Sequence, residues 1–204
     1  MQKITGSGVM VFIKHKEDTL VLLLQNIRKK QLVLMEPGGN QEVGLSSMSN
    51  ALKELYEETF AGLSKSDLDE EHKVLVNYQY LCYAVYIKID DLNFFKEVMG
   101  MNQKILQMAN SRSLHSFNEC KGFNIVNLKD LVNVDFQYYE NDNNKIPLHI
   151  RTQVSLKEFQ AKQIIQKDLT IQLPLFSCSL DKIRIKNPKS PLQVLNNQYT
   201  YVIH

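Results

Sequence analysis

Long hydrophobic runs are scarce in this chain of 204 residues. The apolar runs Leu20–Leu24 and Leu81–Ile87 are far shorter than the ~18–20 residues that cross a bilayer. Near the start, Gly8–Ile13 is too soon followed by Lys14 and His15 to form the hydrophobic region of a secretory signal. We therefore expect neither a membrane anchor nor a signal peptide, and a soluble, cytoplasmic protein.

Cysteine and net charge are also low. The three cysteines, Cys82, Cys120 and Cys178, are widely separated, without a Cys-x-x-Cys or a histidine at metal-ligand spacing. This pattern favours a reducing compartment over a disulfide framework or a zinc site.

The 24 Lys+Arg against 22 Asp+Glu give a formal net charge of +2. Such a balance argues against a protein that coats nucleic acid through bulk charge, and leaves a local basic patch open.

The chain does have the composition of a globular protein, with 44% hydrophobic and 23% charged residues. At ~100–200 residues per domain, it can form one sizeable domain with an appendage. Beyond Asp168 the character changes, and Pro188 and Pro191 separate short strand-like runs. We predict a main domain at residues 1–167 and a C-terminal extension of unknown role at residues 168–204.

Hydrophobic patterning predicts strands and helices in a mixed order. The predicted strands of the main domain are Gly8–Lys14, Thr19–Asn26, Leu32–Met35, Asn77–Asp90 and Gly122–Asn127. The predicted helices run from Ser46 or Ser47 to near Gly62, over Asp91–Asn110 and over Val154–Lys167, with a turn or short helix at Leu128–Val132. The order favours an α/β or α+β sandwich.

One segment of the chain carries a pattern with chemical meaning. On the first predicted helix Glu54, Glu57 and Glu58 fall at i, i+3 and i+4, so their carboxylates share one face, and Lys53 offsets only part of their repulsion. Hard oxygen ligands of this kind suit Mg²⁺ or Mn²⁺. An exposed helix face with solvated glutamates is the alternative. The preceding turn, Pro37–Gly39, makes the combination much rarer than the triplet alone.

The segment from Gly39 to about Leu63 resembles the signature of the Nudix hydrolase family, Gly-x5-Glu-x7-Arg-Glu-U-x-Glu-Glu-x-Gly-U, where U is aliphatic. Gly39 takes the first position, and Lys53–Glu58 occupies the Arg-Glu-U-x-Glu-Glu core in register. The chain departs from the signature at Leu45, which replaces the first Glu, at Lys53, which replaces the Arg, and at Phe60, which replaces the closing Gly. In the family that Glu and Arg help to hold the loop against the helix, and lysine cannot reproduce the bidentate geometry of arginine.

The resemblance implies a Nudix-like α/β/α sandwich with a mixed sheet and a small C-terminal appendage. It also implies a hydrolase that depends on Mg²⁺ or Mn²⁺ and cleaves the diphosphate linkage of a nucleoside diphosphate derivative, such as a dinucleotide, a nucleotide sugar or a capped nucleotide. The implied metal ligands are the Gly39 carbonyl, Glu54, Glu57 and Glu58. Glu54 and Glu119 are the two candidates for the general base, and an ordinary loop acid is the alternative for Glu119.

Candidate substrate contacts come from two other segments. Arg28 and Lys29, with Lys30, could reach substrate phosphates, or they form a solvated hairpin tip. Tyr78, like Tyr80, lies about where diadenosine-polyphosphate-cleaving relatives carry a tyrosine that can stack on a base, and core packing is the alternative.

Two other functions stay open. The chain could be a catalytically degenerate Nudix-like domain that binds a nucleotide or a protein partner. It could also remove caps from RNA, with a basic tail on the phosphate backbone (Lys182, Arg184, Lys186 and Lys189). The segment Asp91–Asn110 is either a lid over the substrate or a packed surface helix. The sequence discloses neither the nucleotide nor the oligomeric state.

Overall fold

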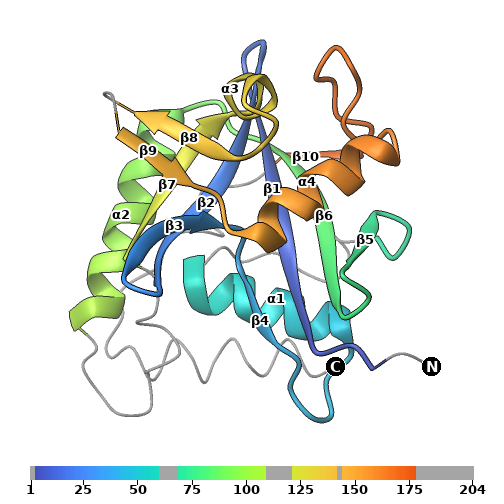
Figure 1. Cartoon of the computed structure of the whole chain (residues 1–204). Helices are drawn as coiled ribbons and strands as arrows, with labels where there is room; N and C mark the ends of the chain where they lie inside the picture. Colours follow the sequence, from blue (N-terminus) through green and yellow to red (C-terminus); the bar gives the residue numbers. More distant parts are fainter. Residues whose placement is uncertain (1–2, 60–68, 109–120, 142–143, 178–204) are drawn as a thin grey trace.

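The structure is a computed structural model that describes residues 3–59, 69–108, 121–141 and 144–177, with the side chains of 102–108 left out. A mixed β-sheet lies between two layers of helices (Figure 1). The described strands are β1 (Gly6–His15), β2 (Asp18–Arg28), β3 (Gln31–Met35), β4 (Gly38–Asn40), β5 (Lys73–Val76), β6 (Tyr80–Lys88), β7 (Gly122–Asn127), β8 (Tyr138–Asn141), β9 (Asn144–Pro147) and β10 (Leu175–Ser177). The described helices are α1 (Ser47–Thr59), α2 (Leu92–Met108), α3 (Leu128–Asn133) and α4 (Ile150–Ala161). This arrangement confirms the predicted fold class of helices around a mixed sheet.

The main sheet has the strand order β10-β6-β1-β2-β3, with β4 beside β1, β5 beside β6 and β7 beside β2. The pairs β1–β6 and β6–β10 are parallel, and the other described pairs are antiparallel. The register of β1 and β4 places Gly8 opposite Gly38. The glycine turn that precedes α1 is therefore built into the sheet edge rather than left as a surface loop.

Successive side chains of a central strand point to opposite faces of the sheet, so the apolar side chains form one core on each face. Met10 and Phe12 of β1 belong to a core with α3 and α4. Val9 and Val11 belong to a second core with α1 and α2. The α2 residues buried in this second core are Phe95, Val98 and Met99. The described part of α2 thus packs on the sheet, as the packed-helix interpretation of Asp91–Asn110 predicts.

Two predicted elements have a boundary that differs from the structure by three residues or more. The predicted strand Asn77–Asp90 is wrong at its start, because Asn77 and Tyr78 adopt positive φ angles (47° and 62°) in a turn between β5 and β6. The last predicted helix begins four residues earlier than Val154, since the His149 side chain accepts a hydrogen bond from the Arg151 amide (3.3 Å) and caps α4. It ends at Ala161, where Gln163 has a φ of 59°.

Other features were not predicted. The short strands β4 and β5 and the hairpin of β8 and β9 were missed. β10 lies in the tail where strand-like runs are expected, and its pairing with β6 in the main sheet was not predicted. Residues beyond 177 lie outside the described part, so the division into residues 1–167 and 168–204 stays a prediction.

Cys82 is buried and free, while Cys120 and Cys178 lie outside the described residues. Among the described helices, none has the length and apolar character to span a membrane.

Candidate active site

Helix α1 places the three glutamates beside the glycine turn. Its first turn is capped by Ser46, whose hydroxyl oxygen accepts a hydrogen bond from the Ser49 amide (3.1 Å). Its buried apolar side chains, Ala51, Leu52 and Leu55, pack in the core shared with β1 and β6. This anchoring fixes the rotation of the helix about its axis and turns the acidic positions toward the turn and the loop before it.

Two glutamates lie against the turn itself. The Gly38 amide donates a hydrogen bond to Oε2 of Glu58 (2.8 Å). A β-carbon at Gly39 would collide with the carboxylate of Glu54, so only glycine lets this carboxylate approach the backbone so closely. The two carboxylates therefore meet the same short piece of backbone from consecutive turns of α1.

Glu58 is buried, and its pKa is raised to about 8. Burial is the largest cause of the shift and the negative charges of Glu54 and Glu36 add to it, whereas the hydrogen bond from the Gly38 amide and the charge of Arg151 oppose it. A second positive charge at this position would favour the ionised carboxylate.

Lys53 joins the loop before α1 to the helix. Its ammonium contacts Oε1 of Glu42 (3.0 Å) and Oε1 of Glu57 (2.7 Å). Burial lowers the pKa of Lys53, but the hydrogen bonds to Glu57 and Glu42 outweigh it, and the net shift is upward. Glu42 is thus the loop acid that contacts Lys53, and it lies three residues before Leu45, the position of the first Glu in the signature.

The loop that carries Glu42 is fixed by amide side chains. The Glu42 amide donates to Oδ1 of Asn50 (2.9 Å), and Nδ2 of Asn50 donates to the Ser7 hydroxyl of β1 (3.0 Å). Nε2 of Gln41 donates to the Leu45 carbonyl (2.8 Å). These contacts hold the loop in place although Leu45 itself contributes no carboxylate.

A buried ion pair on the other side of the turn was not foreseen. Nε of Arg151 in α4 lies 2.6 Å from Oε1 of Glu36, a residue with 0% exposure. Nη2 of Arg151 donates to the carbonyls of Glu36 and Gly38 (3.2 Å each), and the Thr152 hydroxyl donates to the Glu36 carboxylate. The guanidinium also lies 4.3 Å from the centre of the Tyr80 ring. Arg151 therefore fixes the turn whose amide contacts Glu58.

Tyr80 fills the space that two glycines leave. A β-carbon at Gly8 or at Gly38 would collide with its hydroxyl oxygen. That hydroxyl is buried and has no hydrogen-bond partner among the described residues. Burial keeps the pKa of Tyr80 well above its usual value. Tyr80 is thus part of the packing under the turn, as the core-packing alternative predicts for it.

The other predicted substrate contacts lie at the surface. Arg28 and Lys29 are exposed at the hairpin between β2 and β3. The charge of Arg28 contributes to the lowered pKa of His149, after burial and Arg151. Arg28 therefore lies on the side of the molecule where α4 begins. Tyr78 is 69% exposed in the turn between β5 and β6.

Several predicted residues lie outside the described part of the chain. They are Glu119, Phe60, Gly62, Leu63, Lys182, Arg184, Lys186 and Lys189.

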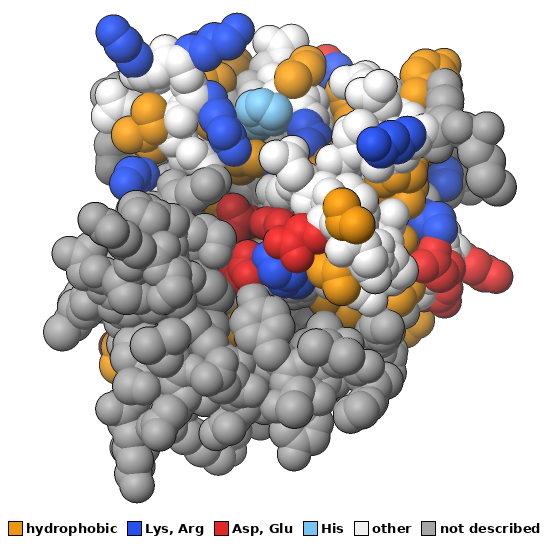
Figure 2. Space-filling view, turned by 90° about the horizontal axis from the view of Figure 1, so that it is seen from below, with side chains coloured by type: hydrophobic (Ala, Val, Ile, Leu, Met, Phe, Trp, Pro, Cys, Tyr) orange, Lys and Arg blue, Asp and Glu red, His pale blue; other side chains and the backbone are white. Residues whose placement is uncertain are grey.

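In the part that the structure does describe, no group of three or more His, Cys, Asp or Glu side chains is arranged to hold a metal ion. The face seen from below shows acidic side chains gathered near its centre, next to basic ones (Figure 2).

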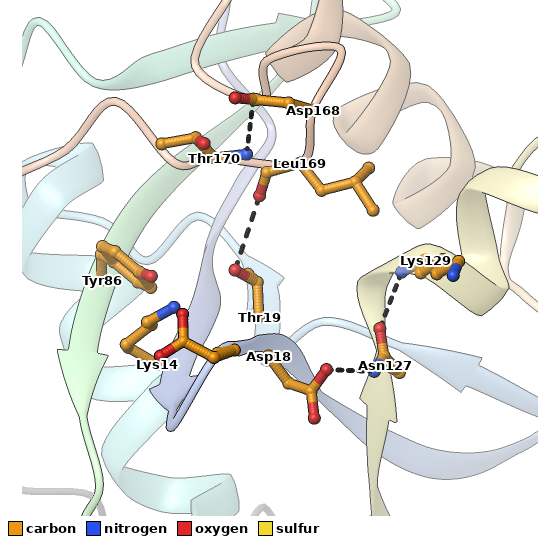
Figure 3. Close-up of a pocket in the computed structure, with 10 residues that line it drawn as sticks. Lys14, Asp18, Thr19, Tyr86, Asn127, Lys129, Asp168, Leu169 and Thr170 are labelled. Atoms are coloured by element: carbon orange, nitrogen blue, oxygen red, sulfur yellow. Dashed lines mark hydrogen bonds between the residues drawn. The ribbon is translucent and has the colours of Figure 1, made fainter.

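A polar cavity of about 260 Å³ lies at the other end of the sheet, where β1 ends and β2 begins (Figure 3). Lys14, Asp18 and Asp168 contribute charges of both signs to its lining. Asp18 accepts a hydrogen bond from Asn127 (3.2 Å). Because these groups share none of the residues around Gly39, the cavity is separate from the acidic helix.

No protein-family model matches the chain, and no curated protein matches it. Solved structures are similar in part. A MutT/nudix family protein from Enterococcus faecalis has 14% identity and a TM-score of 0.49, over 82% of this chain and 64% of its own length. An Ap4A hydrolase from C. elegans has 15% identity and a TM-score of 0.46, over 78% of this chain and 97% of its own. The NUDIX domain of NrtR from Shewanella oneidensis, solved with ADP ribose, has 12% identity and a TM-score of 0.46, over 80% of this chain and 90% of its own length. At these values the similarities do not establish a function.

Proposed function

We propose that the chain is a hydrolase that depends on Mg²⁺ or Mn²⁺ and cleaves the diphosphate linkage of a nucleoside diphosphate derivative. The observation that carries the proposal is the meeting of Glu54 and Glu58 at the Gly38–Gly39 turn. This contact joins the two halves of the signature that the sequence resembles, the glycine and the acidic helix face.

The donor groups at this turn suit a divalent cation. Carboxylate and carbonyl oxygens are the ligands that Mg²⁺ and Mn²⁺ prefer. Glu54, Glu58 and the Gly39 carbonyl would hold the ion, and Glu57 would join them by exchanging its contact with Lys53. A bound divalent ion would neutralise the diphosphate and lower the pKa of an attacking water.

The protein groups themselves would position the reaction. Glu54 is partly exposed whereas Glu57 and Glu58 are buried, so Glu54 is the member of the triplet that can accept a proton from a water in contact with solvent. The second candidate base is Glu119. Arg28 and Lys29 would contact substrate phosphates from the β2–β3 hairpin.

A second candidate function is a binding module without catalysis. The ion pair between Lys53 and Glu57 favours it, because Glu57 is already neutralised by a protein cation. In this case the same surface would bind a nucleotide or a protein.

A screen of phosphate release distinguishes the two functions. Purified protein is incubated with dinucleotides, nucleotide sugars and capped nucleotides in Mg²⁺ or Mn²⁺, beside Glu57→Gln and the matched control Glu97→Gln on the exposed face of α2. The hydrolase proposal expects turnover by the wild type and the control, and a loss of most activity in Glu57→Gln. Equal inactivity of all three, together with binding of one ligand, would support the binding module instead.

A further inference from the structure

An open groove of about 460 Å³ lies between β3, the β8–β9 hairpin and α4. Its described lining consists of three glutamines, two lysines, a tyrosine and a proline, contributed by four elements and the turn before β8. They are Gln31, Gln137, Tyr138, Lys145, Pro147, Gln153 and Lys157. The groove shares none of these residues with the acidic face of α1.

The charged side chains that line the groove are two lysines, Lys145 and Lys157. Lys145 of β9 places its ammonium 4.6 Å from the centre of the Tyr138 ring. Lys157 of α4 is exposed and pairs with Asp135 (2.6 Å), an exposed residue that is not part of the groove lining. Arg28 lies directly opposite Gln31 in the β2–β3 register, so the exposed Arg28 extends the basic surface from the groove onto the hairpin.

The neutral side chains of the groove can make stacking contacts and hydrogen bonds. Tyr138 is half-buried and offers an aromatic ring in the groove. Nε2 of Gln153 donates to the Leu148 carbonyl (2.8 Å), which fixes the orientation of its amide. Glutamine amides both donate and accept hydrogen bonds, as the edges of nucleic acid bases do.

We propose that this groove binds single-stranded nucleic acid. A basic groove that follows a phosphate backbone, together with an aromatic ring on which a base stacks, is the combination that such ligands require. A base would stack on Tyr138, while Lys145, Lys157 and Arg28 would contact phosphates. The inference goes beyond the proposed hydrolase, because it needs neither a metal ion nor hydrolysis.

Fluorescence anisotropy without divalent metal tests the proposal. The probes are labelled RNA and DNA strands of about ten nucleotides and a duplex of the same length. The variants are Tyr138→Ala, Tyr138→Phe and the double variant Lys145→Gln/Lys157→Gln. The control is Lys96→Gln, an exposed lysine of α2 in the helix layer on the opposite face of the sheet. Circular dichroism verifies that each variant is folded.

We expect both single strands to bind more tightly than the duplex, with an affinity that falls as salt rises from about 50 to 200 mM. Tyr138→Ala should weaken binding about 5- to 150-fold, and Tyr138→Phe should not. The lysine double variant should reduce the slope of log affinity against log salt by about 0.7 per lost phosphate contact. Equal loss in Lys96→Gln, affinity independent of salt, tighter binding of the duplex, or no binding at low salt would each overturn the proposal. RNA and DNA results that differ would identify which strand the groove takes.

Discussion

Replacing Arg151 by methionine removes the positive charge that neutralises the buried Glu36 carboxylate. Arg151 is 2.6 Å from Glu36 and also donates to the carbonyls of Glu36 and Gly38. Removal of one partner of a buried ion pair costs about 3–5 kcal/mol, because the other charge stays buried without compensation. Since domains have total stabilities of about 5–15 kcal/mol, the variant should fold but unfold at clearly lower urea concentration.

Urea unfolding followed by circular dichroism measures this cost. Lys157→Met is the matched control, because Lys157 lies in the same helix as Arg151 and its ion pair with Asp135 is exposed, so that its loss should cost about 0–1 kcal/mol. The double variant Arg151→Met/Glu36→Gln should recover part of the loss, because no buried charge is then left alone. A cost for Arg151→Met no larger than that of Lys157→Met would refute the argument that this pair secures the turn.

Three further predictions concern α1 and the turn. Gly39→Ala should displace the Glu54 carboxylate, since the new β-carbon would collide with it. The affinity for Mn²⁺, measured by calorimetry, should therefore fall while the melting temperature changes little. An unchanged affinity would contradict this. Because the pKa of Glu58 is raised to about 8, its stabilising contribution is full below its unfolded pKa and is lost as pH rises through about 8. The wild type without metal should therefore lose stability over this range, and an identical pH profile in Glu58→Gln would count against the shift. Ser46→Ala should cost about 1 kcal/mol through loss of the α1 cap, measured by thermal unfolding; no change in melting temperature would show that the cap contributes nothing.

The local pattern of the chain predicts α1 and the turn before it well. The spacing of Ala51, Leu52 and Leu55 and the serine before them give the helix its start and its buried face. The same periodicity brings Glu54 and Glu58 to one side. These features depend on neighbouring residues, which is why the sequence contains enough information about them.

Contacts between distant segments could not be predicted in the same way. Arg151 meets Glu36 across 115 residues, and no motif joins a single arginine on one helix to a single glutamate before a proline. The contact between Glu42 and Lys53 depends on the path of the loop, which Asn50 fixes from the helix. The signature has a glutamate where this chain has Leu45, so the sequence alone indicates that the acid is missing. In the structure Glu42, three residues earlier in the same loop, contacts Lys53.

Calorimetric titration of Mn²⁺ into the wild type, Glu54→Gln, Glu58→Gln and the control Glu97→Gln tests the central claim most directly. The claim is that the carboxylates at the Gly38–Gly39 turn hold a divalent cation. We predict a saturable site in the wild type and the control, and at least about tenfold weaker binding in Glu54→Gln and Glu58→Gln, which corresponds to about 1.4 kcal/mol. Affinities that are equal in all four proteins, or no binding to the wild type, would contradict the account.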